Sequence, residues 1–479
     1  MKTISSKKQK IIDVLSVLLI VIAVHFVVGA FNGKWPWSPN PYNSYLLQAK
    51  AWLDGHLDLG YNIEYLELAI YQDKYFVSFP PLPSYILLPF AYLYGDNVPE
   101  GWIAFFIMLL GAFYALRIAW HFLGTGAKAV FWTCFLYLGT NVLYDTLDAG
   151  VWFIAQSCAL TFSLLAIFYA LKGKGGHSLF FWGCAIGCRP LQVIYFPILV
   201  YLLYRNLKEK EPEKNFLQMV KSRFYWAFPV LLVALSYMIL NYARFGNIAE
   251  FGHTYLPEFN RGDTRQFKFS YITQNIPTLF RLPEKQENGT LHFYAFNGNN
   301  IFLISPLFVS YLIYLARTIF TRKKVDWILF LSTPVLVIVH IIALCSHETM
   351  GGFHFGHRYI NDCLPFVYFL TLMLAYGKPL FKPLVKVVKT DTSKDCVADS
   401  NEEIANATSE TSVTEDISES NDTNILSDTS VDEQAELLVT EPEQETAEDC
   451  TYFLHYALCA LGMGINLVGS IATNMTWVS

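Results

Sequence analysis

The sequence predicts an all-α polytopic membrane protein with about 11 transmembrane helices. Hydrophobic residues make up 53% of the 479 residues, charged residues only 15%, and the mean hydropathy is +0.33. Apolar runs long enough to cross about 30 Å of hydrocarbon recur along the chain. The 38 Phe, 29 Tyr and 11 Trp fit spans that are bordered by interfacial aromatic rings. This composition excludes a water-soluble enzyme with a single anchor.

The basic loops set the orientation of the spans. Lysines in residues 1–10 precede the first apolar run, so the positive-inside rule places the N-terminus in the cytoplasm. Residues 82–95 are short for a span, and we interpret them as a re-entrant or juxtamembrane helix, because the Lys- and Arg-rich loops then all face the cytoplasm. The expected spans are residues 11–31, 100–122, 126–144, 150–172, 178–189, 190–205, 224–244, 299–316, 326–345, 363–377 and 451–474.

A strongly acidic stretch divides the chain near its end. Residues 391–450 hold 19 acidic residues, one basic residue and no aromatic residue, which leaves a net charge of +12 on the remainder. Such a composition buries too little apolar surface to offset the entropy of ordering, so we expect a disordered cytoplasmic linker. The predicted organisation is a transmembrane domain at 1–390 with its first outer loop at 32–81, this linker, and a last transmembrane helix at 451–479.

The first outer loop combines an interfacial helix with several carboxylates. Its start, from Asn40 and Pro41 to a stop at Gly55, predicts an amphipathic helix with an aromatic face, suited to lying flat at the membrane surface. A single acid in such a loop is usually just solvated, but a group of them at a membrane surface indicates chemistry on a lipid-linked substrate. The candidate catalytic acids of this loop are Glu64, Glu67 and Asp73.

Two further outward features lie between predicted spans. Asp148 follows Asp145 in a short loop, where it is either a catalytic acid or a cap favoured by the helix dipole. Arg189 precedes Pro190 inside an apolar region, where an arginine usually has a partner or a substrate. Its planar guanidinium suits phosphate, and the alternative is an ion pair with an acid such as Asp148.

Residues 347–362 form the fourth outward feature. Arg358 can clamp a phosphate, and the neighbouring glycines let the backbone approach a ligand closely. His354 and His357 are spaced as a pair but lack the acids of a zinc site, so no metal ligand is assigned. No cofactor is assigned from the sequence, and a Mg²⁺ ion held partly by substrate phosphates is compatible with it.

Carboxylates and arginines on one face, with no nucleotide-phosphate loop, indicate a donor that already lies in the membrane. A sugar on a polyprenyl phosphate fits, because its phosphate leaving group needs arginine and the acceptor hydroxyl needs a carboxylate base.

Several short motifs follow one another along residues 10–378. They are Tyr45-x3-Ala49-x5-Gly55, Tyr71-x3-Tyr75-x3-Phe79-Pro80-Pro81-x-Pro83, Gly139-Thr140, Gly183-x3-Gly187-x-Arg189-Pro190, Asn241-Tyr242-x-Arg244-Phe245-Gly246, and Gly351-Gly352-x2-Phe355-Gly356-x-Arg358-Tyr359 with Pro365. In these motifs and their order the sequence resembles the GT-C glycosyltransferases, the class of the protein O-mannosyltransferases and the bacterial aminoarabinose transferases of lipid A.

The resemblance implies inverting transfer of a sugar from a polyprenyl-phosphate donor to a glycan, lipid or protein acceptor at the extracytoplasmic face of the cell membrane. The partners are then the lipid-linked donor, the acceptor and membrane lipids, with no nucleic acid. Residues expected to bind substrate or lipid phosphate are Tyr45, Lys74, Arg189, Arg244, His354, His357, Arg358 and Tyr359.

The chain departs from the family pattern at two positions. The family has an aspartate where this chain has Pro41, so the base falls to Glu64, Glu67, Asp73 or Asp148, or else activity has been lost. The family lysine before the Pro-Pro pair is replaced by Phe79, which leaves Lys74 as the nearest substitute. The alternative functions are a transporter or flippase of a lipid-linked glycan, a polysaccharide polymerase or ligase of a different membrane class, and a catalytically silent scaffold.

Overall fold

The computed structural model describes residues 6–322, 325–377 and 441–478. Residues 1–382 and 453–479 form one compact unit, and residues 383–452 form a second. Most of the predicted acidic linker therefore lies outside the described residues. The helices are α1 (Ser6–Asn32), α2 (Ser44–Leu53), α3 (Leu82–Tyr94), α4 (Glu100–Leu123), α5 (Ala127–Leu138), α6 (Val142–Asp145), α7 (Val151–Leu171), α8 (Gly175–Ile186), α9 (Phe196–Lys210), α10 (Phe216–Ser222), α11 (Ala227–Phe245), α12 (Phe269–Asn275), α13 (Ile301–Ile304), α14 (Leu307–Phe320), α15 (Trp327–Cys345), α16 (Leu364–Tyr376) and α17 (Glu441–Val478).

The prediction of a helical polytopic membrane protein is confirmed. Within the described ranges, seven helices are long and apolar enough to cross a bilayer, and α5 and α14 are shorter apolar helices. Every predicted span coincides with a helix or with two consecutive helices, while the number of eleven crossings stays a prediction. The last helix begins at Glu441, ahead of the predicted residue 451.

Helices α7 and α16 form the centre of the larger unit. The apolar stretch of α7 is 89% buried and that of the span Arg358–Tyr376, which contains α16, is 83% buried, against 11% in the span that contains α11. Helix α7 packs against α4, α8 and α9, and α16 packs against α14 and α15. Since a span without buried faces must present its apolar residues to lipid, α11 lies at the edge of the bundle.

The break predicted at Pro190 is present. Helix α8 ends at Ile186, and a 3₁₀ turn at Pro190–Tyr195 joins it to α9. Proline cannot donate to the helix ladder, so the chain leaves the helical path just before it. Arg189 has an extended backbone in this gap, with φ −139° and ψ 101°. The break therefore frees the arginine to turn toward neighbouring segments.

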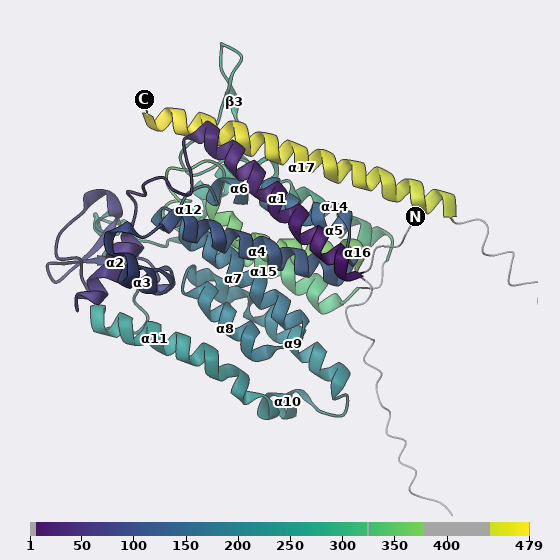
Figure 1. The fold of residues 1–479 in the computed structure, drawn as a ribbon, viewed down its shortest axis with the longest axis horizontal. Coiled ribbons are helices and arrows are strands. Elements are labelled where there is room, and N and C mark those ends of the chain that lie inside the picture. The colour runs from purple at the N-terminus through teal and green to yellow at the C-terminus, as the bar shows by residue number, and fades with distance from the viewer. Residues whose placement is uncertain (1–5, 323–324, 378–440, 479) are drawn as a thin grey trace, which may run out of the picture. The chain divides into compact units, whose positions relative to one another are not determined.

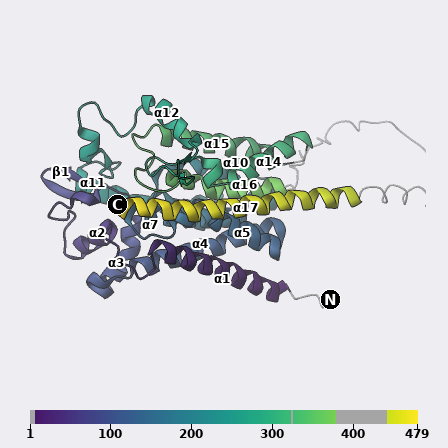
Figure 2. The same ribbon diagram turned by 90° about the horizontal axis from the view of Figure 1, so that it is seen from above.

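The first loop consists of α2, a β-hairpin and α3. Strands β1 (Leu68–Tyr71) and β2 (Lys74–Val77) pair antiparallel, with Leu68 opposite Val77. The two turn residues, Gln72 and Asp73, both have left-handed φ angles, as a tight two-residue hairpin turn requires. Figures 1 and 2 show α2, α3 and the hairpin at the end of the bundle away from the N-terminal end of α1. Helix α3 has 13 residues and packs on α2, in agreement with a juxtamembrane helix.

The predicted start of the first-loop helix is wrong by several residues. Helix α2 begins at Ser44, and Asn40 caps no helix. Instead, the Asn40 side chain accepts a bond from the Tyr42 backbone N–H and donates to the carbonyl of Ala149 at 3.1 Å. The asparagine is used to tie the loop to the start of α7, and this tertiary bond takes the place of the local cap.

Candidate functional site

Arg189 is held by an acid from a distant segment. Its Nε donates to Oδ2 of Asp362 at 2.7 Å, and the Asp362 side chain is almost completely buried. The Gln192 side chain donates to the Asp362 carbonyl, which fixes the backbone of the acid as well. The ion pair predicted for Arg189 is therefore present, but its partner is Asp362 and not Asp148. An arginine in an apolar region needs such a partner, and Asp362 is the acid that the fold brings within reach.

A second arginine lies beside the first. Arg358 is 5% exposed, and its Nε and Nη2 both donate to the carbonyl of Gly351. The guanidinium carbons of Arg189 and Arg358 lie 4.5 and 5.1 Å from the centre of the same Tyr359 ring. Among the described residues, Arg358 forms no ion pair. Asp362 thus pairs directly with Arg189, while Arg358 has no directly paired carboxylate in the described part of the chain.

Glu67 is the first-loop acid that reaches the arginines. Its Oε2 accepts a hydrogen bond from Nε1 of Trp152 at 3.0 Å, and the Arg358 guanidinium lies 5.6 Å from the same indole. Glu67 has a left-handed φ of 51°, and Ser78 donates to its carbonyl. A left-handed non-glycine residue costs free energy, so the surrounding contacts hold it in place. The side chain keeps an exposed edge, but the protein atoms around it shield it from water and raise the pKa of Glu67, while Arg358 and the Trp152 bond oppose the shift.

Two histidines and a further acid surround this place. The ring of His347 lies 5.9 Å from that of His253 and 6.0 Å from that of Tyr359. Burial lowers the pKa of His253 to about 4 and of His347 to about 3, so both rings are neutral at pH 7. Burial, with the charges of Glu67 and Glu348, raises the pKa of Glu258 to about 7.

Buried polar side chains bond to the segment that carries Arg358. Gln156 of α7 donates to the carbonyl of Arg358 at 2.7 Å, and Asn361 donates to Oδ2 of Asp145 at 2.7 Å. Burial raises the pKa of Asp145 to about 7, while the Asn361 bond and the nearby arginines oppose the shift. Asp145 therefore contributes less than a full negative charge near neutral pH.

The other predicted carboxylates do not join this cluster. Glu64 is exposed in a turn before β1, and Asp73 is exposed at the tip of the hairpin. Asp148 forms an ion pair with Lys34, and its Oδ1 accepts a bond from the Gly150 backbone N–H at 2.7 Å. Burial alone would lower the pKa of Lys34, but Asp148 outweighs it and the pKa is raised.

Of the other predicted binding residues, Tyr45 lies near Arg189, while Lys74 and Arg244 make contacts within the first loop or with the hairpin. Tyr45 is buried and packs its ring against Phe79. Its hydroxyl is close enough to Arg189 to interact with the charge of the guanidinium. Lys74 instead lies near Asp58, with Nζ 3.6 Å from Oδ1. Arg244 donates to the carbonyl of Val77 at 3.1 Å and so fastens the hairpin to α11.

His354 and His357 stabilise the loop that carries Arg358. Both side chains are buried, and His357 Nε2 lies 3.1 Å from the carbonyl of Thr278. The backbone N–H of His354 donates to the carbonyl of Ala295. Burial lowers the pKa of both rings, to about 4 for His357. These contacts anchor the loop to residues 278–298.

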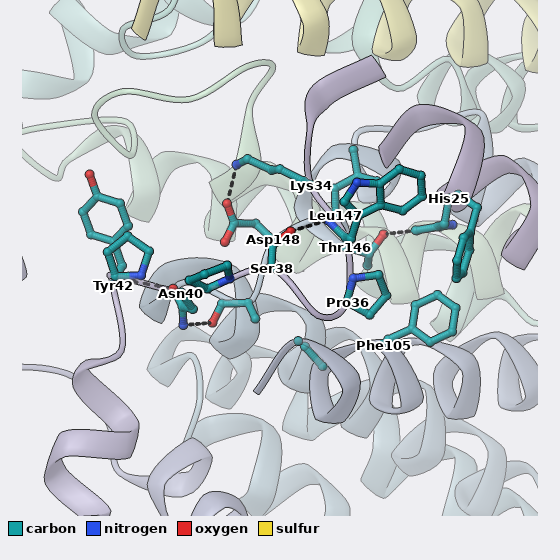
Figure 3. A pocket seen from close by; sticks show the side chains of 17 residues that line it. His25, Lys34, Pro36, Ser38, Asn40, Tyr42, Phe105, Thr146, Leu147 and Asp148 are labelled. Carbon is teal, nitrogen blue, oxygen red and sulfur yellow. Dashed lines mark hydrogen bonds and ion pairs between the residues drawn. The ribbon is translucent and has the colours of Figure 1, made fainter. Parts of the chain in front are cut away.

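A separate cavity of about 200 Å³ lies beside the cluster (Figure 3). Its walls come from the end of α1, residues 34–42, α4 and the loop before α7, and the Lys34–Asp148 pair lies in it. No group of three or more His, Cys, Asp or Glu side chains able to hold a metal ion occurs in the described part of the chain. We therefore assign no step to a metal.

Sequence reasoning missed four members of the cluster. Asp362 lies four residues after Arg358, and the need of an intramembrane arginine for a partner could have pointed to it. Trp152 was visible only as an aromatic residue at a span end. Glu258 and His253 lie in residues 245–298, which carried no recognisable pattern.

Fold and cluster together define a polytopic helical membrane protein with a basic, aromatic and acidic site at one end. Two crystal structures of ArnT from Cupriavidus metallidurans are similar to this chain. The apo structure has a TM-score of 0.42 at 13% identity, and the structure bound to undecaprenyl phosphate has 0.44 at 14%. The match covers 75% of this chain and 59% of the ArnT chain. No family model and no curated protein matches the chain.

Proposed function

We propose that this protein is an integral-membrane glycosyltransferase that moves a sugar from a polyprenyl-phosphate donor to an acceptor at the outer membrane face. The observation that carries the proposal is the environment of Arg358. This guanidinium is buried without an ion pair among the described residues, shares the Tyr359 ring with Arg189, and lies over the indole that binds Glu67. A buried charge of this kind calls for an anion, and a phosphate supplies one.

The roles of the residues follow from their charges. Arg189 and Arg358 bind the donor phosphate and stabilise the negative charge that grows on it as the sugar leaves. Trp152 and Tyr359 offer flat faces on which the sugar ring can lie. Glu67 accepts the proton of the acceptor hydroxyl, whose oxygen forms the new bond to the sugar anomeric carbon. The bond from that carbon to the phosphate oxygen breaks, and polyprenyl phosphate leaves.

Glu67 suits the role of general base better than the other candidate acids. Shielding from water raises its pKa from the ordinary value, which strengthens it as a proton acceptor near neutral pH. Glu67 is bound to Trp152 beside Arg358, whereas Glu64 and Asp73 show no contact with Trp152 or the arginines in the described part of the chain. Asp148 is neutralised by Lys34. The choice of Glu67 also fits the absence of an acid at Pro41, because the function of the missing aspartate is then met from the hairpin.

A transfer assay tests the proposal. The purified protein in lipid nanodiscs is given polyprenyl-phosphate sugars together with envelope glycans as acceptors, and free polyprenyl phosphate and glycosylated product are measured. The proposal expects both products in equal amounts, and neither with Arg358→Ala. Donor that stays intact while it moves between leaflets of proteoliposomes would favour a flippase. Protein that binds donor but neither transfers nor moves it would identify a silent scaffold.

A further inference from the structure

The cavity next to the cluster has no role in the function proposed above. It measures about 200 Å³ and opens between the end of α1, residues 34–42 and the loop before α7 (Figure 3). Pockets for drug-sized ligands measure about 300–1,000 Å³, so this one suits a single small ring. It is too small for a polyprenyl chain.

The apolar walls of the cavity are flat. Trp35 lines it and stacks on Trp37 with the rings 5.1 Å apart and 6° from parallel. Phe26 packs at 5.8 Å from Trp35 and at 6.0 Å from Phe105, and both phenylalanines also line the cavity. Because these rings support one another, their faces are fixed before any ligand arrives. Such faces suit the C–H surface of a saturated ring.

The polar groups of the cavity form a neutral set. Lys34 and Asp148 pair with each other, and their side chains stay 33% and 21% exposed. Their accessible edges offer a donor and an acceptor side by side. A free anion would be repelled by Asp148 and a free cation by Lys34, so a neutral ligand with hydroxyl groups fits best. His25 and Thr146 bond to each other at 2.7 Å and close the inner end.

The cavity shares a wall with the candidate site. Tyr42 lines the cavity, and its ring lies 5.3 Å from that of Trp152, which binds Glu67. Phe153 lies between the two places, with Lys34 Nζ 6.0 Å and the Arg358 guanidinium 5.7 Å from its ring. A ring held in the cavity is thus separated from the proposed base and phosphate site by single aromatic side chains.

We propose that this cavity is a subsite for the acceptor and that it holds a neutral saccharide ring next to the reacting part of the acceptor, with the Lys34–Asp148 pair and the face of Trp35 as its contacts. The role of the bound sugar as an acceptor rests on the proposed function. The binding of a neutral sugar ring can be measured without donor and without transfer.

Saturation-transfer NMR on the full chain in phosphatidylcholine nanodiscs tests the subsite. The probes are the methyl glycosides of glucose, galactose, mannose and arabinose, with glucuronate and glucosamine as charged comparisons, and empty nanodiscs give the background. We expect at least one neutral glycoside to bind and both charged sugars to bind less. Asp148→Asn should weaken binding about tenfold, as the loss of a charge-assisted hydrogen bond does.

Two further variants keep the test decisive. Ala149→Leu fills the cavity without altering the ion pair and should abolish glycoside binding. Lys50→Met removes the surface ion pair with Asp96 and should leave binding unchanged. No glycoside bound by the wild-type protein, or equal binding by wild type and Ala149→Leu, overturns the subsite. If undecaprenyl phosphate still binds in the same preparation, the proposed function survives that result.

Discussion

Arg189 and Asp362 form a buried ion pair across 173 positions of sequence, with Nε 2.7 Å from Oδ2. The pair joins the gap between α8 and α9 to the turn that carries Arg358 and Tyr359. Because both arginines contact the Tyr359 ring, the pair also sets the distance between the two guanidinium groups. It therefore has a structural role and, in our account, a role in binding phosphate.

These two roles can be separated by mutation. Asp362→Ala leaves the Arg189 charge buried and unpaired, and it should lower the free energy of unfolding by about 3–5 kcal/mol. The double variant Arg189→Met, Asp362→Leu replaces the pair by apolar groups and should recover most of that stability. Thermal unfolding in detergent measures both changes. Donor binding by the stable double variant equal to wild type would show that Arg189 has no role in binding phosphate.

Glu67→Gln should lower the rate of sugar transfer by about 10²- to 10⁴-fold, because it removes the general base while keeping the shape of the side chain. The amide can still accept the Trp152 hydrogen bond, so donor binding should be unchanged. Glu64→Gln and Asp73→Asn, at exposed positions of the same loop, are the matched controls. A Glu67→Gln protein with full activity would remove the base from our account.

The transfer rate should fall as the pH drops through the pKa of Glu67, which burial raises above the ordinary 4.5. Trp152→Phe removes the indole hydrogen bond that lowers the pKa of Glu67, so the acid limb of the profile should move to higher pH by roughly one unit or less. An unchanged or lower midpoint in Trp152→Phe would contradict the role of this hydrogen bond in setting the pKa of Glu67.

The raised pKa of Glu258 makes the stability of the fold fall with rising pH, whereas the transfer rate should rise with pH. The folded protein binds the Glu258 proton more tightly than the unfolded chain does, so this contribution is full below pH 4.5 and is lost as the pH rises through about 7. Glu258→Gln should remove that part of the pH dependence. Chemical denaturation at pH 5 and pH 8 gives the free energy of unfolding of wild type and Glu258→Gln. An equal change of that free energy between the two pH values in both proteins would contradict the raised pKa of Glu258.

Gly187→Ala should destabilise the bundle by about 1–3 kcal/mol, because the new methyl carbon would lie 1.9 Å from the Tyr237 hydroxyl of α11. Tyr237→Leu makes room and should restore part of the loss. Gly176→Ala, where the nearest atom is 3.9 Å away, is the control in the same helix. The melting temperatures of the four proteins decide the matter, and a tolerated Gly187→Ala would contradict the close packing of α8 on α11.

The sequence predicted the helical scaffold well, because long apolar runs and prolines act locally. The break before Pro190 and the short helix after residue 82 are both present. It failed where a tertiary contact outweighs a local preference, as at Asn40, which binds Ala149 instead of capping a helix. It also missed the hairpin, because the four-residue strands that flank Gln72 and Asp73 show no alternation of apolar and polar residues.

The site was predicted in part. Arg189, Arg358, Tyr359 and Glu67 were all candidates, and the fold brings these four together. Nothing local distinguishes Glu67 from Glu64 or Asp73, because the difference lies in the distant Trp152. The partner of Arg189 was likewise beyond a sequence pattern, since Asp148 and Asp362 are both acids near span ends and only the packing chooses between them.

The most direct measurement is the affinity of undecaprenyl phosphate for the protein in nanodiscs, determined for wild type, Arg358→Ala and Arg223→Ala. Arg223 pairs with Glu211 on the α9–α10 segment and controls for the loss of an arginine as such. The account predicts that wild type and Arg223→Ala bind equally and that Arg358→Ala binds at least about tenfold more weakly. Equal binding by all three proteins would contradict the claim that this arginine holds the donor phosphate.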